Sequence, residues 1–96
     1  MALRILIVED EVKITQALSY LFNKQKIDVD IANDGEEGLI LAGKDIYDVI
    51  VLDIMLPGVD GIQILKTIRK NGVKTPVIML TAKDTVDDRV FLLRFF

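Results

Sequence analysis

The sequence contains no cysteine, no histidine and no tryptophan among its 96 residues. The lack of cysteine excludes disulfides and thiolate metal sites, and it is compatible with a reducing cytoplasm. The lack of histidine removes the commonest general base of enzymes. The net charge is −3, and lysine and arginine form no basic stripe that nucleic acid would require. We therefore expect a cytoplasmic chain that does not bind nucleic acid.

Long hydrophobic runs are also missing. No window approaches the ~18 apolar residues of a membrane helix, and acidic residues follow the first apolar run too soon for a signal peptide. Apolar residues nevertheless make up 51% of the chain, against 28% that are charged. This balance predicts one small globular domain over residues 1–96, without a membrane segment.

Two kinds of segment alternate along the chain. Residues 5–8, 49–52 and 77–80 are short apolar runs rich in β-branched side chains, which is typical of strands covered on both faces. Residues 27–31 alternate apolar and acidic side chains, as in a half-exposed edge strand. The segments between them show helical spacing, which predicts helices over residues 11–25, 34–43 and 60–71, the second capped by Asp34 and the third by Asp60. A fourth helix is predicted from an Asp84 cap into the C-terminus. The order βαβαβαβα predicts a doubly wound α/β sheet.

In such a sheet, ligands bind outside the carboxyl ends of the strands. The first strand ends in Glu9-Asp10, the third in Asp53, and the fourth in Thr81-Ala82. If these three strands are neighbours, three carboxylates and one hydroxyl share a rim that suits Mg²⁺ and phosphoryl chemistry, with an aspartate as a possible nucleophile. Taken singly, each of these residues also has a simpler interpretation. Glu9-Asp10 would be a solvated loop that caps the next helix, Asp53 a turn former, and Thr81 an ordinary residue at a strand end.

The stretches ILIVEDE, DVIVLDIMLPGVDG and PVIMLTAKD, in this order and spacing, resemble the receiver domain of bacterial two-component response regulators. The similarity covers residues 3 to about 90 and is strongest to the CheY-like domain that heads winged-helix transcription factors of the OmpR type. It implies a flavodoxin-like parallel sheet with strand order 2-1-3-4. It also implies that Asp53 accepts a phosphoryl group from a sensor histidine kinase.

The resemblance assigns the other site residues as well. Asp10 matches the acid that binds magnesium together with the phosphoacceptor, and Glu9 matches its neighbour that binds mainly through water. Met55 matches the position whose backbone carbonyl completes the metal shell. Thr81 matches the hydroxyl that moves to the phosphoryl oxygen, with the Ala82 backbone amide beside it. A hydroxyl that donates to an oxygen present only after phosphorylation can couple the chemistry to a loop shift.

The resemblance ends after about residue 90, where FLLRFF replaces the family's continuing chain. The family's fifth strand, the Lys-Pro pair that ends it and the fifth helix have no counterpart. We therefore expect a receiver domain that is truncated or altered at its C-terminus and lacks its phosphoryl-binding lysine. Lys83 is the only lysine near the rim, but in the family its position usually faces solvent.

Without a fifth strand, the outer edge of residues 77–80 is expected to be open, and an open apolar edge favours association. The apolar tail predicts either the last turns of a fourth helix packed over the gap or a homo-oligomer, including one formed by exchange of elements.

We interpret the chain as a phospho-accepting signalling domain rather than a turnover enzyme. The main alternative is a receiver-derived fragment with a structural, self-associating role and no phosphorylation. A phosphohydrolase with an aspartate nucleophile usually needs a second acid two residues on, where this chain has Met55.

Overall fold

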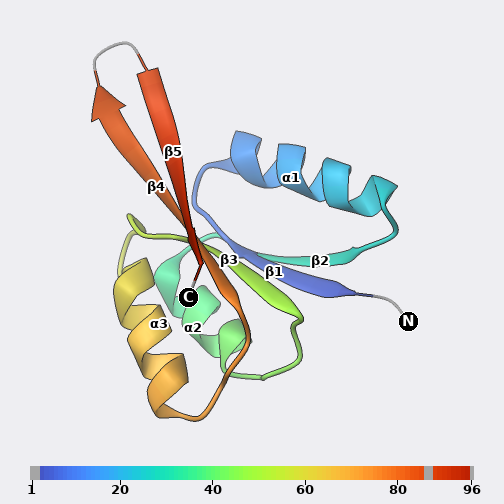
Figure 1. Cartoon of the computed structure of the whole chain (residues 1–96), viewed down its shortest axis with the longest axis vertical. Helices are drawn as coiled ribbons and strands as arrows, with labels where there is room; N and C mark the ends of the chain where they lie inside the picture. Colours follow the sequence, from blue (N-terminus) through green and yellow to red (C-terminus); the bar gives the residue numbers. More distant parts are fainter. Residues whose placement is uncertain (1–2, 86–87, 96) are drawn as a thin grey trace.

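A computed structural model of the chain describes residues 3–85 and 88–95, with side chains described for residues 3–80. In chain order the strands and helices are β1 (Arg4–Val8), α1 (Val12–Lys24), β2 (Asp28–Ala32), α2 (Gly35–Ala42), β3 (Val49–Asp53), α3 (Gly61–Lys70), β4 (Val77–Thr85) and β5 (Asp88–Phe95). Strands and helices alternate from β1 to β4 among the described residues, and a hairpin formed by β4 and β5 follows (Figure 1).

The sheet has the strand order β2-β1-β3-β4-β5, and its first four strands are parallel. The predicted parallel order 2-1-3-4 is therefore confirmed, with β2 at one edge as its alternating sequence indicated. Figure 1 shows α1 on one side of this sheet and α2 and α3 on the other. Among the described residues, no helix is long and apolar enough to cross a membrane.

The two faces of the sheet bury alternate side chains of β1 and β3. The α2–α3 side holds the larger cluster, which includes Leu6, Val8, Ile50, Leu52, Ile64, Ile68, Val77 and Met79. On the α1 side, the described hydrophobic cluster has three buried members, Ile5, Ile7 and Val51, with half-buried neighbours around them. The core thus lies mainly between the sheet and the α2–α3 pair, and the opposite face is thinly covered.

The helix boundaries follow the capping residues that the sequence indicated. The Asp34 carboxylate accepts a hydrogen bond from the Glu37 amide at 2.8 Å, and Asp60 accepts one from the Gln63 amide at 2.9 Å. Each bond satisfies one of the amides that the first turn of a helix leaves without a partner. Gly72, with φ at +87°, turns the chain away after α3 in a conformation that favours glycine.

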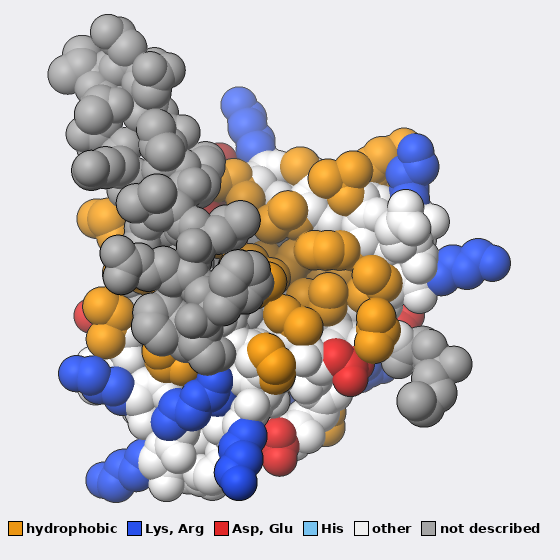
Figure 2. All heavy atoms as spheres, viewed as in Figure 1, with side chains coloured by type: hydrophobic (Ala, Val, Ile, Leu, Met, Phe, Trp, Pro, Cys, Tyr) orange, Lys and Arg blue, Asp and Glu red, His pale blue; other side chains and the backbone are white. Residues whose placement is uncertain are grey.

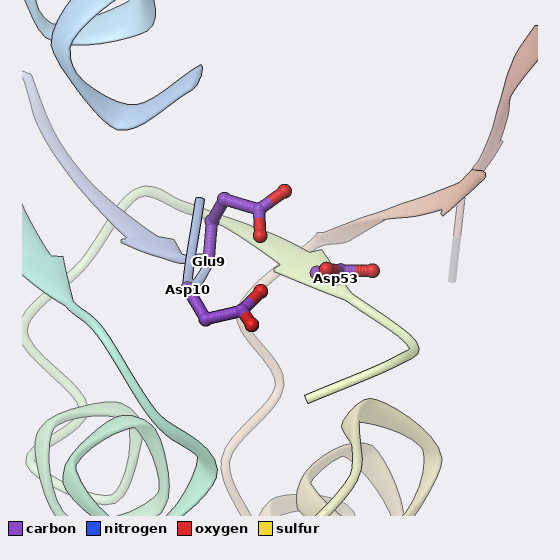
Figure 3. Close-up of side chains that lie close together, drawn as sticks. All are labelled: Glu9, Asp10 and Asp53. Carbon is purple, nitrogen blue, oxygen red and sulfur yellow. The ribbon is translucent and has the colours of Figure 1, made fainter. Parts of the chain in front are cut away.

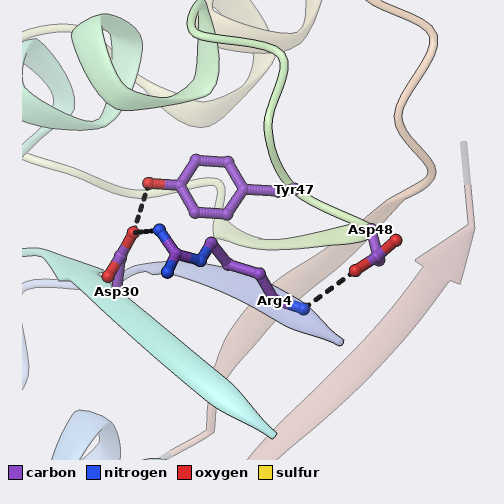
Figure 4. A network of polar contacts seen from close by, with 4 residues as sticks. All are labelled: Arg4, Asp30, Tyr47 and Asp48. Carbon is purple, nitrogen blue, oxygen red and sulfur yellow. Dashed lines mark hydrogen bonds and ion pairs between the residues drawn. The ribbon is translucent and has the colours of Figure 1, made fainter. Parts of the chain in front are cut away.

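A polar network ties the amino ends of the central strands together (Figure 4). The Tyr47 hydroxyl donates to Asp30 at 2.7 Å, and the Arg4 guanidinium lies 3.8 Å from the same carboxylate. The Arg4 backbone amide donates to Asp48 at 2.8 Å. Burial, followed by the contact with Asp30, raises the pKa of Tyr47 to about 12, so the phenol keeps its proton and its role as a donor.

Two predictions about the C-terminal segment are wrong. The fourth helix expected from Asp84 is absent: residues 84–85 belong to β4, and residues 88–95 form β5. The edge of residues 77–80 is also not open, because β5 pairs with it antiparallel from Ile78 opposite Phe95 to Thr85 opposite Asp88. A run of valine, leucine and phenylalanine favours a strand as readily as a helix, and pairing satisfies the backbone groups of an apolar edge.

The β4–β5 hairpin extends beyond the rest of the sheet. Residues 77–80 of β4 pair with β3, whereas residues 81–85 pair only with β5. Figure 1 shows this outer part of the hairpin leaving the other strands. The side chains of residues 81–96 lie outside the described residues, so the predictions about the tail's packing are not tested.

Candidate functional site

Three carboxylates meet at the carboxyl ends of β1 and β3 (Figure 3). Each of Glu9, Asp10 and Asp53 offers an oxygen, and these oxygens all lie within 4.8 Å of one another. Glu9 and Asp10 follow β1 directly, and Asp53 is the last residue of β3. The parallel pairing of the two strands, with Val8 opposite Leu52, brings them together. The structure therefore unites the three acids that the sequence placed at one rim.

Burial differs among the three acids. Glu9 and Asp53 are only 3% and 8% exposed, whereas Asp10 is exposed. A carboxylate that loses water prefers to be neutral, and neighbouring negative charge adds to this preference. Burial raises the pKa of Glu9 to about 8, and contacts with the carboxyl groups of Asp10 and Asp53 act in the same direction. When all three acids are ionised, the protein groups around the site thus do not neutralise their combined negative charge.

Backbone amides orient two of the carboxylates. The Met55 amide donates to Oδ1 of Asp53 at 3.1 Å, and the Glu11 amide donates to Oε2 of Glu9 at 3.1 Å. Met55 itself is 69% exposed, in the loop that follows β3. Among the described residues, no backbone amide donates to Oδ2 of Asp53, which lies beside the exposed loop that contains Met55.

Gly61, the first residue of α3, packs directly against the backbone of Asp53. A Cβ atom at this position would lie 2.3 Å from the Asp53 carbonyl oxygen and 2.9 Å from Cα of Ile54. The Gly61 amide also donates to the Ile54 carbonyl at 3.0 Å. Gly61 lies in the helix predicted over residues 60–71, but the helical spacing alone gave no signal of this contact.

Thr81 follows the last residue of β4 that pairs with β3, since Leu80 lies opposite Asp53 in the register. The Ile54 amide donates to the Leu80 carbonyl at 3.1 Å, which holds the two strand ends together. The backbone of Thr81 and Ala82 thus continues past the acidic rim within β4. The side chains of Thr81, Ala82 and Lys83 are outside the described residues.

The three acids suit a hard divalent cation. They are oxygen donors from the ends of two neighbouring strands, and the chain has no histidine or cysteine to select a softer metal. Burial, followed by the neighbouring carboxyl groups, raises the pKa of Glu9, and a bound cation would favour its charged form. A doubly wound sheet with such an acidic rim at its topological switch point, between β1 and β3, defines a class of small α/β domains that bind ligands at this position.

Comparison with known proteins identifies the family within that class. The model of the response regulator receiver domain matches residues 5–95, and the chain belongs to this family. It is 48% identical over 88 residues to the transcriptional regulatory protein HprR of Escherichia coli strain K12, covering 92% of this chain and 39% of the relative. It is 42% identical over 87 residues to CiaR of Streptococcus pneumoniae, covering 91% of this chain and 38% of the relative.

Solved structures agree with this assignment. The receiver domain of the Francisella response regulator 1452 has a TM-score of 0.79 at 43% identity, over 88% of this chain and 69% of that one. The Vibrio cholerae chemotaxis protein CheY4 has a TM-score of 0.78 at 30% identity, over 91% of this chain and 74% of that one. The chain spans about two fifths of the length of the curated relatives. The predicted resemblance and the CheY-like fold are confirmed.

Proposed function

We propose that this domain accepts a phosphoryl group on Asp53 from the phosphohistidine of a sensor histidine kinase, in a reaction that requires Mg²⁺. The observation that carries the proposal is the meeting of Glu9, Asp10 and Asp53, with oxygens within 4.8 Å of one another, at the ligand-binding edge of a receiver fold. A cytoplasmic location fits this role and the lack of cysteine.

The proposed metal ligands are Asp10, Asp53 and the backbone carbonyl of Met55, with Glu9 acting mainly through water. Bound Mg²⁺ would neutralise the crowded carboxylates and the charge on the transferred phosphoryl group. Metal binding competes with the proton on Glu9, whose pKa is raised to about 8, so binding strengthens as the pH rises toward that value.

In the proposed transfer, a carboxylate oxygen of Asp53 attacks phosphorus. An O–P bond forms as the P–N bond of the donor breaks, and the imidazole nitrogen keeps the electron pair and takes up a proton. The Met55 amide, 3.1 Å from Oδ1, fixes the orientation of the carboxylate during this step. The acceptor is consumed rather than regenerated in one turnover, which makes the domain a signalling module more than an enzyme.

The proposed readout depends on Thr81 and Ala82. After transfer, the Thr81 hydroxyl would donate to a phosphoryl oxygen, with the Ala82 amide beside it. The position of Thr81 in β4, one residue past the pair formed by Asp53 and Leu80, supports this role. Any movement of Thr81 would act on the β4–β5 hairpin, because residues 81–85 pair only with β5.

The experiment is to incubate the chain with Mg²⁺ and phosphoramidate, a small donor with a P–N bond, and to measure the intact mass. The wild type is expected to gain one phosphoryl group, and the gain is expected to disappear in Asp53→Asn or with EDTA. Asp28→Asn, which removes an exposed carboxylate on the edge strand, is the matched control and should be modified like the wild type.

No adduct on the wild type, or one that survives Asp53→Asn, would contradict the proposal. The first of these results would favour the structural role, in which a receiver-derived domain is not phosphorylated.

A further inference from the structure

Helix α1 carries a wider apolar stripe than the sheet covers. Thr15 is its only buried residue, and Ile14 and Leu18 are half-buried. Ala17 is exposed, and Leu21 is 57% exposed. One side of the stripe therefore packs on the sheet while the other side faces outward, although amphipathic helices of small domains usually bury their apolar stripe.

A hollow of about 340 Å³ lies beside this stripe, between α1 and β4. The described residues that line it are Lys13, Ile14, Ala17, Leu18 and Leu80. On the same face of the sheet, Val49, Ile78 and Leu80 are only half-buried. Figure 2 shows hydrophobic side chains gathered over α1 and the strands beside it. We name Ile14, Ala17, Leu18, Leu21 and Leu80 the α1 surface.

The face of the sheet that packs against α1 is only partly covered by the described residues. Parallel sheets have helices on both faces, because their strands are apolar on both. Here α2 and α3 cover one face, and α1 covers the other alone. A second helix lying next to α1 would fill the hollow. Among the described helices, α1 has the exposed apolar stripe that could do this, so a second copy of the chain can supply it.

The charges at the two ends of α1 favour an antiparallel over a parallel orientation of the two helices in a pair. Glu11 precedes the first turn and Lys24 ends the last one. In an antiparallel pair centred on Ala17, each Glu11 lies near Lys24 of the other copy, and this favourable contact occurs twice. A parallel pair would instead bring like charges together. The small side chain of Ala17 at the crossing point allows the 8–10 Å approach that packed helices adopt.

We propose that the chain forms a two-fold dimer through the α1 surface, with the two α1 helices antiparallel and crossing at Ala17. In this pair Leu21 lies opposite Lys13 of the other copy, at the mouth of the hollow. The edge of β4, where association was expected from the sequence, is occupied by β5. The inference does not depend on phosphoryl transfer.

The first test is light scattering on the full chain over a series of concentrations. The wild type is expected to be dimeric, and Leu21→Lys is expected to weaken the dimer at least ten-fold, because it replaces an apolar side chain with a positive charge opposite Lys13 of the other copy. Ile40→Lys is the matched control: it makes the same kind of change at an apolar residue of α2 that is 68% exposed, away from the α1 surface. A monomeric wild type, or equal effects of the two substitutions, would overturn the proposal. Circular dichroism checks that both variants are folded.

The second test uses the absence of native cysteine. A residue on a two-fold axis meets its own copy, so Ala17→Cys should form a covalent dimer under mild oxidation, within the Cα separation of about 4.4–6.8 Å that disulfides require. Glu37→Cys, at an exposed position of α2, should cross-link at least ten-fold less. Equal cross-linking of the two variants, in a chain that is dimeric, would refute the antiparallel α1 geometry.

Discussion

Replacing Glu9 by glutamine should make the metal-free domain more stable near neutral pH. Glu9 is only 3% exposed and lies beside Asp10 and Asp53, so its charged form is disfavoured in the folded state. Glutamine has nearly the same shape, and its side-chain oxygen can still accept the hydrogen bond that the Glu11 amide donates at 3.1 Å. The substitution thus removes the ionisation while keeping the contact.

The size of the effect follows from the pKa of Glu9, which is raised from 4.5 to about 8. Between these values the unfolded chain loses the proton while the folded chain keeps it, so the unfolded state binds fewer protons. The contribution of Glu9 to stability is therefore complete below pH 4.5 and is lost as the pH rises through about 8. At pH 7 the loss amounts to about 3 kcal/mol. Glutamine is neutral in both the folded and the unfolded state, so the Glu9→Gln variant does not lose this stability as the pH rises.

The assay is urea unfolding in EDTA at pH 5, 7 and 8.5. The advantage of Glu9→Gln over the wild type should grow with pH toward about 3 kcal/mol or more. Glu11→Gln, which makes the same change of charge at an exposed neighbour, should show no such growth. Saturating Mg²⁺ should stabilise the wild type more than Glu9→Gln. A constant difference between Glu9→Gln and the wild type at all three pH values would refute the reasoning.

Two further substitutions test the packing behind the site. Gly61→Ala should lower the free energy of unfolding by about 1–3 kcal/mol, because its Cβ would lie 2.3 Å from the Asp53 carbonyl oxygen; an unchanged urea midpoint would contradict this contact. Tyr47→Phe should lower it by about 1 kcal/mol through loss of the 2.7 Å bond to Asp30, while the phosphoryl gain stays at the wild-type level; a loss of the gain would show that the two ends of the sheet are coupled.

The sequence correctly predicted the helices and strands for which the spacing of apolar residues and the residues at the ends indicate the same element. Apolar runs marked β1, β3 and the start of β4, and Asp34 and Asp60 form the predicted caps. The meeting of Glu9, Asp10 and Asp53 also followed, because parallel strands deliver their last residues to one edge. The strands and caps needed only local patterns, whereas the adjacency of β1 and β3, on which the meeting of the acids depends, came from the resemblance to receiver domains.

The segment after Thr81 could not be predicted in the same way. Its apolar residues fit a helix or a strand, and pairing with the edge of β4 decided between them. The tight contact at Gly61 was equally hidden, since a glycine at the start of a helix has many possible reasons. In both cases the deciding interaction is a backbone contact that forms only in the folded arrangement and that no local residue pattern reveals.

The measurement that bears most directly on the proposed function is the intact mass of the chain after reaction with phosphoramidate and Mg²⁺. We expect one added phosphoryl group, located at Asp53 by its loss in Asp53→Asn and dependent on Mg²⁺. An unmodified chain, or an adduct that persists after Asp53→Asn, would contradict it.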